Sequence, residues 1–165
     1  MRSRTPTTGS RSTGSEPATP RPTPTPLDVA ARLLARAPRT EADLEARLVA
    51  RGYQKATAAK TVVRCRELGY VGDERFAHDR AKALRERGAG SLKIAPDLAG
   101  RGLPEALVEE AVEASMDGEP EATWARRVLE RERKARGPQA WRLLASRGFP
   151  EDVVADVVGD PGDGW

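Results

Sequence analysis

The sequence is poor in the residue types that build disulfide frameworks, metal centres and most catalytic sites. Its 165 residues include one cysteine, Cys65, and one histidine, His78. A single cysteine excludes an intramolecular disulfide and a cysteine-rich metal site, and a single histidine excludes a histidine metal cluster. No nucleophile or carboxylate motif accompanies His78, and no Walker A or dinucleotide-binding glycine pattern occurs. We therefore expect a protein that is not an enzyme and that uses no metal or cofactor.

Aromatic residues and long apolar runs are also scarce. Aromatic residues make up 4% of the chain and apolar residues 38%, which favours a layered helical body built on Ala, Leu and Val. No run rich in β-branched residues alternates between apolar and polar side chains, so strands are not expected. No apolar segment approaches the roughly 20 residues of a membrane helix, and no secretory apolar segment follows the N-terminus. The sequence predicts an all-α protein of the cytoplasm with no membrane contact.

The net positive charge is concentrated in the N-terminal segment. Residues 1–26 contain four arginines and one glutamate, which accounts for the whole net charge of +3. This Pro/Thr-rich segment cannot bury enough apolar surface to repay the entropy of ordering, so we expect a disordered tail. Residues 27–72 carry nine basic and five acidic side chains, whereas residues 73–117 carry seven and ten. Such segregation of charge suits a partner that has its own charge pattern.

One short phrase occurs three times and indicates an internal repeat. It is a leucine followed by Arg-Gly and a large apolar residue, found at residues 48–53, 98–103 and 144–149. Its glycines, Gly52, Gly102 and Gly148, are about 50 residues apart, a period typical of repeat architectures. The phrase predicts a helix stop, because glycine after the last turn adopts the left-handed conformation without a Cβ penalty. Arginine in the last turn suits the negative end of the helix dipole.

Apolar spacing of the helical type places three short helices in each repeat. We predict that Thr40 and Asp73 are N-caps and that Ser91 can cap the helix that follows it. Pro96 should make that helix start near Ile94 or distort it.

The first helix of the third repeat is expected to extend as far as Arg136. The sequence thus predicts three tandem three-helix repeats in an elongated helical body. They cover residues 27–72, 73–117 and 118–158, with residues 159–165 frayed.

Four features taken together resemble the RecX family of bacterial recombination regulators. One is the succession of three-helix repeats itself. The others are stretches of sequence: residues 68–77 (LGYVGDERFA), residues 87–103 with their two Arg-Gly pairs, and residues 143–149 (LLASRGF). Each stretch is loose alone, but their order along residues 27–158 is specific. Pro96, which falls inside a helix of that family, is a departure.

The resemblance implies a regulator of the RecA recombinase. Such a protein binds the RecA filament on single-stranded DNA, lies along its helical groove and inhibits its ATPase, strand-exchange and coprotease activities. It acts in DNA repair and recombination and in the SOS response. We expect a monomer, and weak direct contact with DNA stays open.

Basic side chains are the candidates for partner binding, because caps, core packing and turns account for the other residues of the motifs. The candidates are Arg51, Arg64, Arg85, Arg87, Lys93, Arg101, Arg127, Arg131, Lys134 and Arg147. Two other interpretations stay open. One is a direct nucleic-acid-binding protein built of helix-turn-helix-like units, and the other is a helical scaffold for an unrelated partner.

Overall fold

A computed structural model describes residues 23–133 and 135–159 of the chain. Within these residues the chain forms nine helices and no strand, which confirms the all-α prediction. The helices are α1 (Pro26–Arg36), α2 (Glu41–Val49), α3 (Lys55–Glu67), α4 (Asp73–Glu86), α5 (Ser91–Ala99), α6 (Glu105–Ala114), α7 (Glu121–Arg131), α8 (Gly137–Ser146) and α9 (Glu151–Val158).

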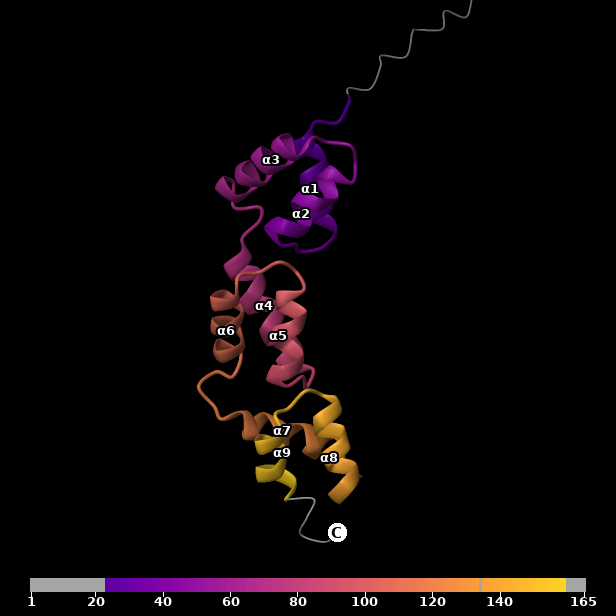
Figure 1. The fold of residues 1–165 in the computed structure, drawn as a ribbon, viewed down its shortest axis with the longest axis vertical. Coiled ribbons are helices and arrows are strands. Elements are labelled where there is room, and N and C mark those ends of the chain that lie inside the picture. Colours follow the sequence, from indigo (N-terminus) through magenta and orange to yellow (C-terminus); the bar gives the residue numbers. More distant parts are fainter. Residues whose placement is uncertain (1–22, 134, 160–165) are drawn as a thin grey trace, which may run out of the picture.

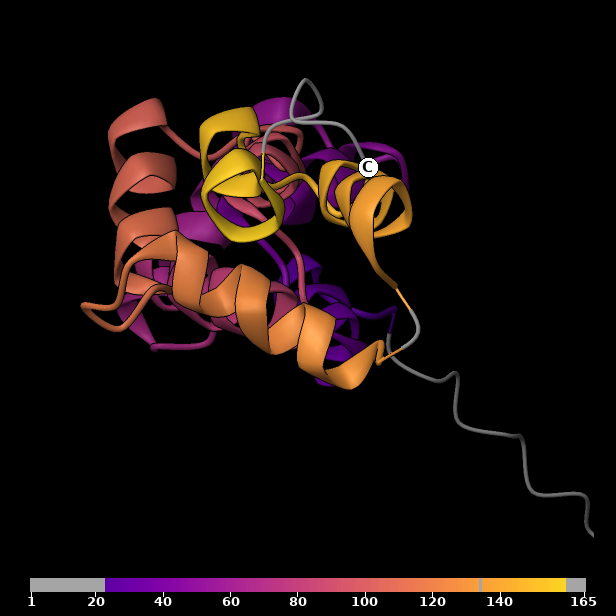
Figure 2. The same cartoon turned by 90° about the horizontal axis from the view of Figure 1, so that it is seen from below.

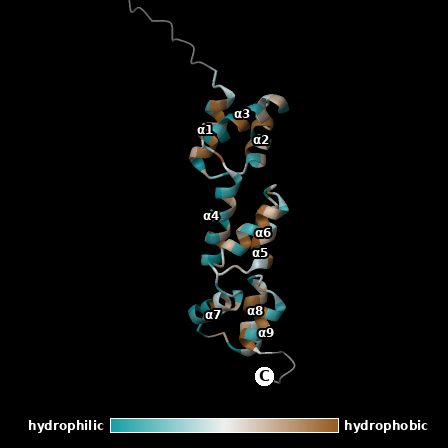
Figure 3. Cartoon of the chain, turned by 90° about the vertical axis from the view of Figure 1, so that its left-hand side faces the viewer, coloured by the Kyte–Doolittle hydropathy of each residue, from teal (hydrophilic) through white to brown (hydrophobic). Residues whose placement is uncertain are grey.

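The helices pack in three groups of three that follow one another along an elongated body (Figure 1). We name them unit 1 (α1–α3), unit 2 (α4–α6) and unit 3 (α7–α9). Figure 2 looks along the long axis, and the units lie in front of one another. Each unit has its own apolar cluster, and Figure 3 shows the apolar residues on the inner helix faces. The predicted architecture of three tandem three-helix repeats is confirmed, while the residue boundaries of the units stay a prediction.

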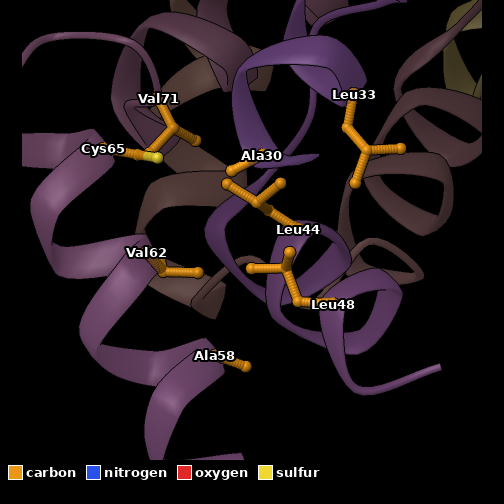
Figure 4. Packing of buried hydrophobic residues seen from close by; sticks show 8 residues of the cluster. All are labelled: Ala30, Leu33, Leu44, Leu48, Ala58, Val62, Cys65 and Val71. Atoms are coloured by element: carbon orange, nitrogen blue, oxygen red, sulfur yellow. The ribbon is translucent and has the colours of Figure 1, made fainter. Parts of the chain in front are cut away.

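The core of unit 1 is a small apolar cluster to which all three helices contribute. Leu44 and Leu48 of α2 are fully buried against Val62 and Cys65 of α3 (Figure 4). Burial raises the pKa of the Cys65 thiol. Cys65 therefore belongs to the apolar core, and a buried thiol with a raised pKa is a poor nucleophile.

The repeated Arg-Gly phrase is a helix stop in all three units. Gly52, Gly102 and Gly148 have φ angles of 93°, 77° and 83°. After α2 the Tyr53 amide donates to the Leu48 carbonyl at 3.3 Å, and after α8 the Phe149 amide donates to the Leu144 carbonyl at 3.2 Å. This is the Schellman pattern, in which the apolar residue after glycine folds back on the helix.

The helix starts follow the sequence less closely. Thr40 caps α2, since the Asp43 amide donates to its hydroxyl at 3.1 Å, as predicted. The prediction for Ser91 is wrong, because Gly90 is the N-cap of α5 and Ser91 is the first helical residue. The prediction that Pro96 makes this helix start near Ile94 is wrong as well, while a distortion of the helix stays a prediction. The helix α5 begins at Ser91 and runs through Pro96, which is exposed and loses only one backbone hydrogen bond.

Helix α7 is shorter than the sequence indicated, because it ends at Arg131 and not at Arg136. Three further predictions lie wholly or largely outside the described residues. They concern the N-terminal tail, of which only residues 23–26 are described, the C-terminal residues, of which only Gly159 is described, and Lys134.

Candidate partner-binding surface at the joints between units

Units 1 and 2, and units 2 and 3, are joined in the same way. We call these contacts the first joint and the second joint. At the first joint the Thr40 hydroxyl, at the start of α2, donates to the Arg101 carbonyl at the end of α5, at 2.8 Å. At the second joint the Gly90 amide, at the start of α5, donates to the Arg147 carbonyl at the end of α8, also at 2.8 Å. The helix stops of units 2 and 3 therefore each dock on the start of the middle helix of the preceding unit.

A carboxylate strengthens each joint. Asp73, the first residue of α4, accepts a hydrogen bond from the Glu41 amide of α2 at 2.8 Å. Glu121, the first residue of α7, accepts one from the Ser91 amide of α5 at 2.6 Å. The predicted N-cap role of Asp73 is wrong, because Gly72 is the N-cap of α4. Its carboxylate instead satisfies the free amide at the start of a helix in the neighbouring unit.

The joints place the middle helices α2, α5 and α8 end to end along one side of the body (Figure 1). The negative end of α5 meets the positive end of α2, and the negative end of α8 meets the positive end of α5, which is the favourable order of helix dipoles. The packing is close. A Cβ atom on Gly102 would lie 2.9 Å from the Ala42 Cβ atom, and one on Gly90 would overlap the carbonyl group of Gly148.

The second joint brings together four of the candidate basic residues. The Arg131 guanidinium donates to the Glu86 carbonyl at 2.9 Å, and the Arg147 guanidinium donates to the Arg87 carbonyl at 3.0 Å. The backbone of Lys93 packs against Gly148. Arg87, Lys93, Arg131 and Arg147, which we call the basic cluster, therefore lie around one joint.

Arg85 also lies at the second joint, but beneath its surface. The side chain is fully buried, and one guanidinium nitrogen lies 2.6 Å from a Glu121 carboxylate oxygen. Its Nε–H group donates to the Ser115 hydroxyl at 3.3 Å. The interpretation of Arg85 as an exposed partner-binding residue is wrong. A sequence signal existed, because Arg85 continues the buried stripe of Ala77 and Ala81 at a spacing of four residues.

Arg101 lies at the first joint and is held by its neighbours. Its guanidinium lies over the Phe76 ring, 5.6 Å from the centroid, and its Nε atom lies 3.1 Å from the Asp97 carboxylate. Asp97 also accepts from Arg80 at 2.8 Å. The Arg80 hydrogen bonds, with those from Arg101, lower the pKa of Asp97 to about 2, and the same pairing raises the pKa of Arg80.

The three remaining candidates are dispersed. Arg51 donates to the Arg47 carbonyl at 3.0 Å at the outer end of unit 1. Arg64 pairs with Glu67 at 3.0 Å on the exposed face of α3. Arg127 lies over the Trp124 ring, 4.6 Å from its centroid, and pairs with Glu119 at 2.7 Å. Among the three arginines of the repeated phrase, Arg101 and Arg147 lie at joints. Arg51 does not, because unit 1 has no preceding unit on which its helix stop could dock.

In residues 23–133 and 135–159, no group of three or more His, Cys, Asp or Glu side chains is arranged to hold a metal ion. None of the helices in the same residues is long and apolar enough to cross a membrane. His78 lies 3.3 Å from Glu110 on a partly exposed face.

Known proteins share both sequence and fold with this chain. A family model described as "RecX, first three-helix domain" matches residues 27–65. The "Regulatory protein RecX" of Chromohalobacter salexigens is 33% identical over 144 residues, which cover 81% of this chain and 91% of that relative. The protein of the same name from Thermus thermophilus is 36% identical over 142 residues, which cover 84% of this chain and 96% of the relative.

Two solved structures show the same fold. The crystal structure of RecX from Lactobacillus salivarius has a TM-score of 0.66 at 16% identity and covers 83% of this chain and 94% of that chain. A crystal structure of a regulatory protein RecX has a TM-score of 0.60 at 18% identity, covering 80% and 71%. Together with the sequence relatives, they confirm the resemblance identified from the repeated motifs: the chain belongs to the RecX family of regulatory proteins.

Proposed function

We propose that this chain binds the RecA nucleoprotein filament and inhibits its ATPase, strand-exchange and coprotease activities without catalysing a reaction. The observation that supports this most directly is the elongated body, in which two joints of one design set the units in line. A long body can contact several protomers of a filament at once. Binding that favours one filament geometry shifts turnover without any chemistry. We infer that the protein acts as a monomer in the cytoplasm.

The basic cluster at the second joint is the part of the surface that we assign to the filament. Arg131 and Arg147 are already held by backbone carbonyls, so ordering them on binding costs less side-chain entropy. The more dispersed candidates Arg51, Arg64, Arg101 and Arg127, and Lys134, belong to the same proposal as further contacts along the body.

An ATPase assay tests the proposal. RecA on single-stranded DNA is mixed with the chain at substoichiometric amounts, and we expect ATP turnover and strand exchange to fall. Replacing two residues of the basic cluster, Arg87→Glu with Lys93→Glu, should weaken this inhibition about tenfold or more. The double variant Lys55→Glu with Lys60→Glu changes charge equally on α3 and serves as the control. Unchanged ATPase and strand exchange with the wild-type chain would contradict the proposal.

Direct nucleic-acid binding is the second candidate function. It is favoured by unit 1, where Lys55 and Lys60 of α3 are exposed and belong to a unit with excess positive charge. Binding of this kind would be strongly salt-dependent. The logarithm of the binding constant would fall with the logarithm of the salt concentration, with a slope of about −0.7 per neutralised phosphate of single-stranded DNA. The α3 double variant should then lose DNA affinity in the absence of RecA, whereas the variant of the basic cluster should keep it.

A further inference from the structure

A groove at the first joint lies apart from the basic cluster. It is about 580 Å³ in volume and runs between the end of α1 and one face of α4. Apolar side chains from both units line it, namely Leu34, Pro38, Tyr70, Val71, Phe76 and Ala83. Tyr70 is 53% exposed there, which makes it one of the largest apolar side chains left open to solvent in the described residues. An apolar groove with aromatic walls can hold the side chains of a protein segment.

The charges around the groove indicate what kind of segment fits. Four arginines line it, but Arg39 pairs with Asp43 at 2.8 Å, and Arg80 and Arg101 both pair with Asp97. Arg75 is exposed at the same groove and forms no ion pair with any residue that the structure describes. Asp79 lies one turn from Arg75 on the same helix and lines the groove as well. Four arginines therefore stand against three carboxylates, Asp43, Asp79 and Asp97, which leaves an excess of one positive charge beside an apolar floor.

A nucleic acid fits this groove less well than a protein segment does. Asp79 also lines it, and a carboxylate repels a row of phosphates. Three of the four arginines already have carboxylate partners, so they contribute little to the neutralisation of a polyanion. One carboxylate next to an apolar side chain matches the single excess charge of the groove and its apolar floor together.

We propose that this groove binds a segment of the RecA protein in which an apolar or aromatic side chain is followed or preceded closely by a carboxylate. The apolar side chain fills the space between Tyr70, Phe76 and Ala83, and the carboxylate pairs with Arg75. The proposal rests on the proposed function, because it takes the recombinase as the partner. It adds a second contact, at the first joint, to the basic cluster at the second.

Two variants on the same helix test the charge. Arg75→Glu reverses the charge at the groove, and Lys82→Glu makes the same change at an exposed position of α4 that does not line it. Affinity for RecA filaments on single-stranded DNA is measured by anisotropy of the labelled chain. We expect Arg75→Glu to weaken binding about tenfold and Lys82→Glu to change it less than twofold. Equal affinities of the two variants would overturn the groove proposal, whereas a wild-type chain that does not bind would overturn the proposed function itself.

Photo-crosslinking identifies the occupant. The photoreactive residue p-benzoylphenylalanine is placed at Tyr70 in one chain and, as a control, at Leu92, which is 63% exposed in unit 2. Cross-linked peptides are sequenced after irradiation with the filament. We expect Tyr70 chains to yield a RecA peptide with Asp or Glu close to the cross-linked residue, and Leu92 chains to yield a different peptide or none. A cross-link from Tyr70 to DNA, or to a second copy of this chain, would overturn the assignment.

Discussion

Gly148 and Gly52 occupy the same position of the repeated phrase but have different surroundings. Both have positive φ angles, 83° and 93°. A Cβ atom on Gly148 would lie 2.6 Å from the Lys93 Cβ atom and 2.8 Å from its backbone nitrogen, whereas one on Gly52 would meet nothing within 4 Å. The two glycines therefore separate the cost of backbone strain from the cost of crowding at a joint.

We predict that Gly148→Ala destabilises the protein more than Gly52→Ala does. Both variants should lose about 1 kcal/mol from the left-handed backbone, and Gly148→Ala should lose a further 1–3 kcal/mol, roughly, from overpacking against a backbone that cannot move freely. Urea denaturation followed by circular dichroism measures both. Equal urea midpoints for the two variants would show that the second joint accommodates the added methyl group without loss of stability.

Residues such as Gly52 and Gly148 could be predicted from the sequence, since a helix stop is local. The roles of Asp73 and Arg85 could not. Asp73 looks like a local cap, but it accepts from Glu41, which is 32 residues away. Arg85 looks like an exposed charge, but it pairs with Glu121, which is 36 residues away. The spacing of Ala77, Ala81 and Arg85 indicates that Arg85 is buried. The partners of Asp73 and Arg85 depend on how one unit docks on the next, and the spacing within a unit carries no signal of them.

At the scale of helices, Asp97 ties α5 to α4 through Arg80. Its pKa in the folded chain is about 2, against an ordinary value of 3.8. A carboxyl group with a lowered pKa in the folded state stabilises the protein above the unfolded pKa, and this contribution is lost as the pH falls through the folded value. The contribution of Asp97 should therefore be complete above about pH 5 and disappear by about pH 1, with a size of up to about 2 kcal/mol.

We predict that Asp97→Asn flattens the loss of stability at low pH. The variant should be less stable than the wild-type chain at pH 6, and the difference should shrink as the pH falls toward 2. Thermal melting at a series of pH values measures this. A constant difference between the two chains over the whole range would mean that the pairing of Asp97 with Arg80 and Arg101 is not what the acid transition removes.

The ends of helices show where local sequence rules meet tertiary packing. Pro96 should interrupt a helix, yet α5 runs from Ser91 to Ala99 because Ile94 and Leu98 are fully buried on its inner face. Burial of such residues outweighs one missing hydrogen bond. The opposite holds for α7, which ends at Arg131 although charged residues suited to a helix continue beyond it. Between Leu129 and the Gly137-Pro138 pair the sequence offers only one apolar residue, Ala135, which is too small to anchor a further turn.

At the scale of the whole molecule, the two joints share a design but differ in strength. The second joint has two backbone hydrogen bonds, from the Gly90 amide to the Arg147 carbonyl and from the Leu92 amide to the Gly148 carbonyl. The buried pair of Arg85 and Glu121 lies beneath them. The first joint relies on the Thr40 hydroxyl and the Asp73 carboxylate, and cavities of about 580 and 610 Å³ flank it. Fewer contacts and more open space allow movement at lower cost.

We predict that the chain bends at the first joint and keeps the second joint rigid. Spin labels attached to cysteines at exposed positions in each unit, Arg36→Cys, Lys82→Cys and Arg142→Cys, allow distances to be measured by pulsed electron resonance, with Cys65→Ala to leave no native thiol. The distance distribution between positions 36 and 82 should be broader than that between 82 and 142, because only the first pair spans the weaker joint. Binding to the filament should narrow the distance distribution between positions 36 and 82 if the groove at this joint holds a partner segment. Distance distributions of equal width in the free chain would contradict this prediction, because they would show that the two joints are equally mobile.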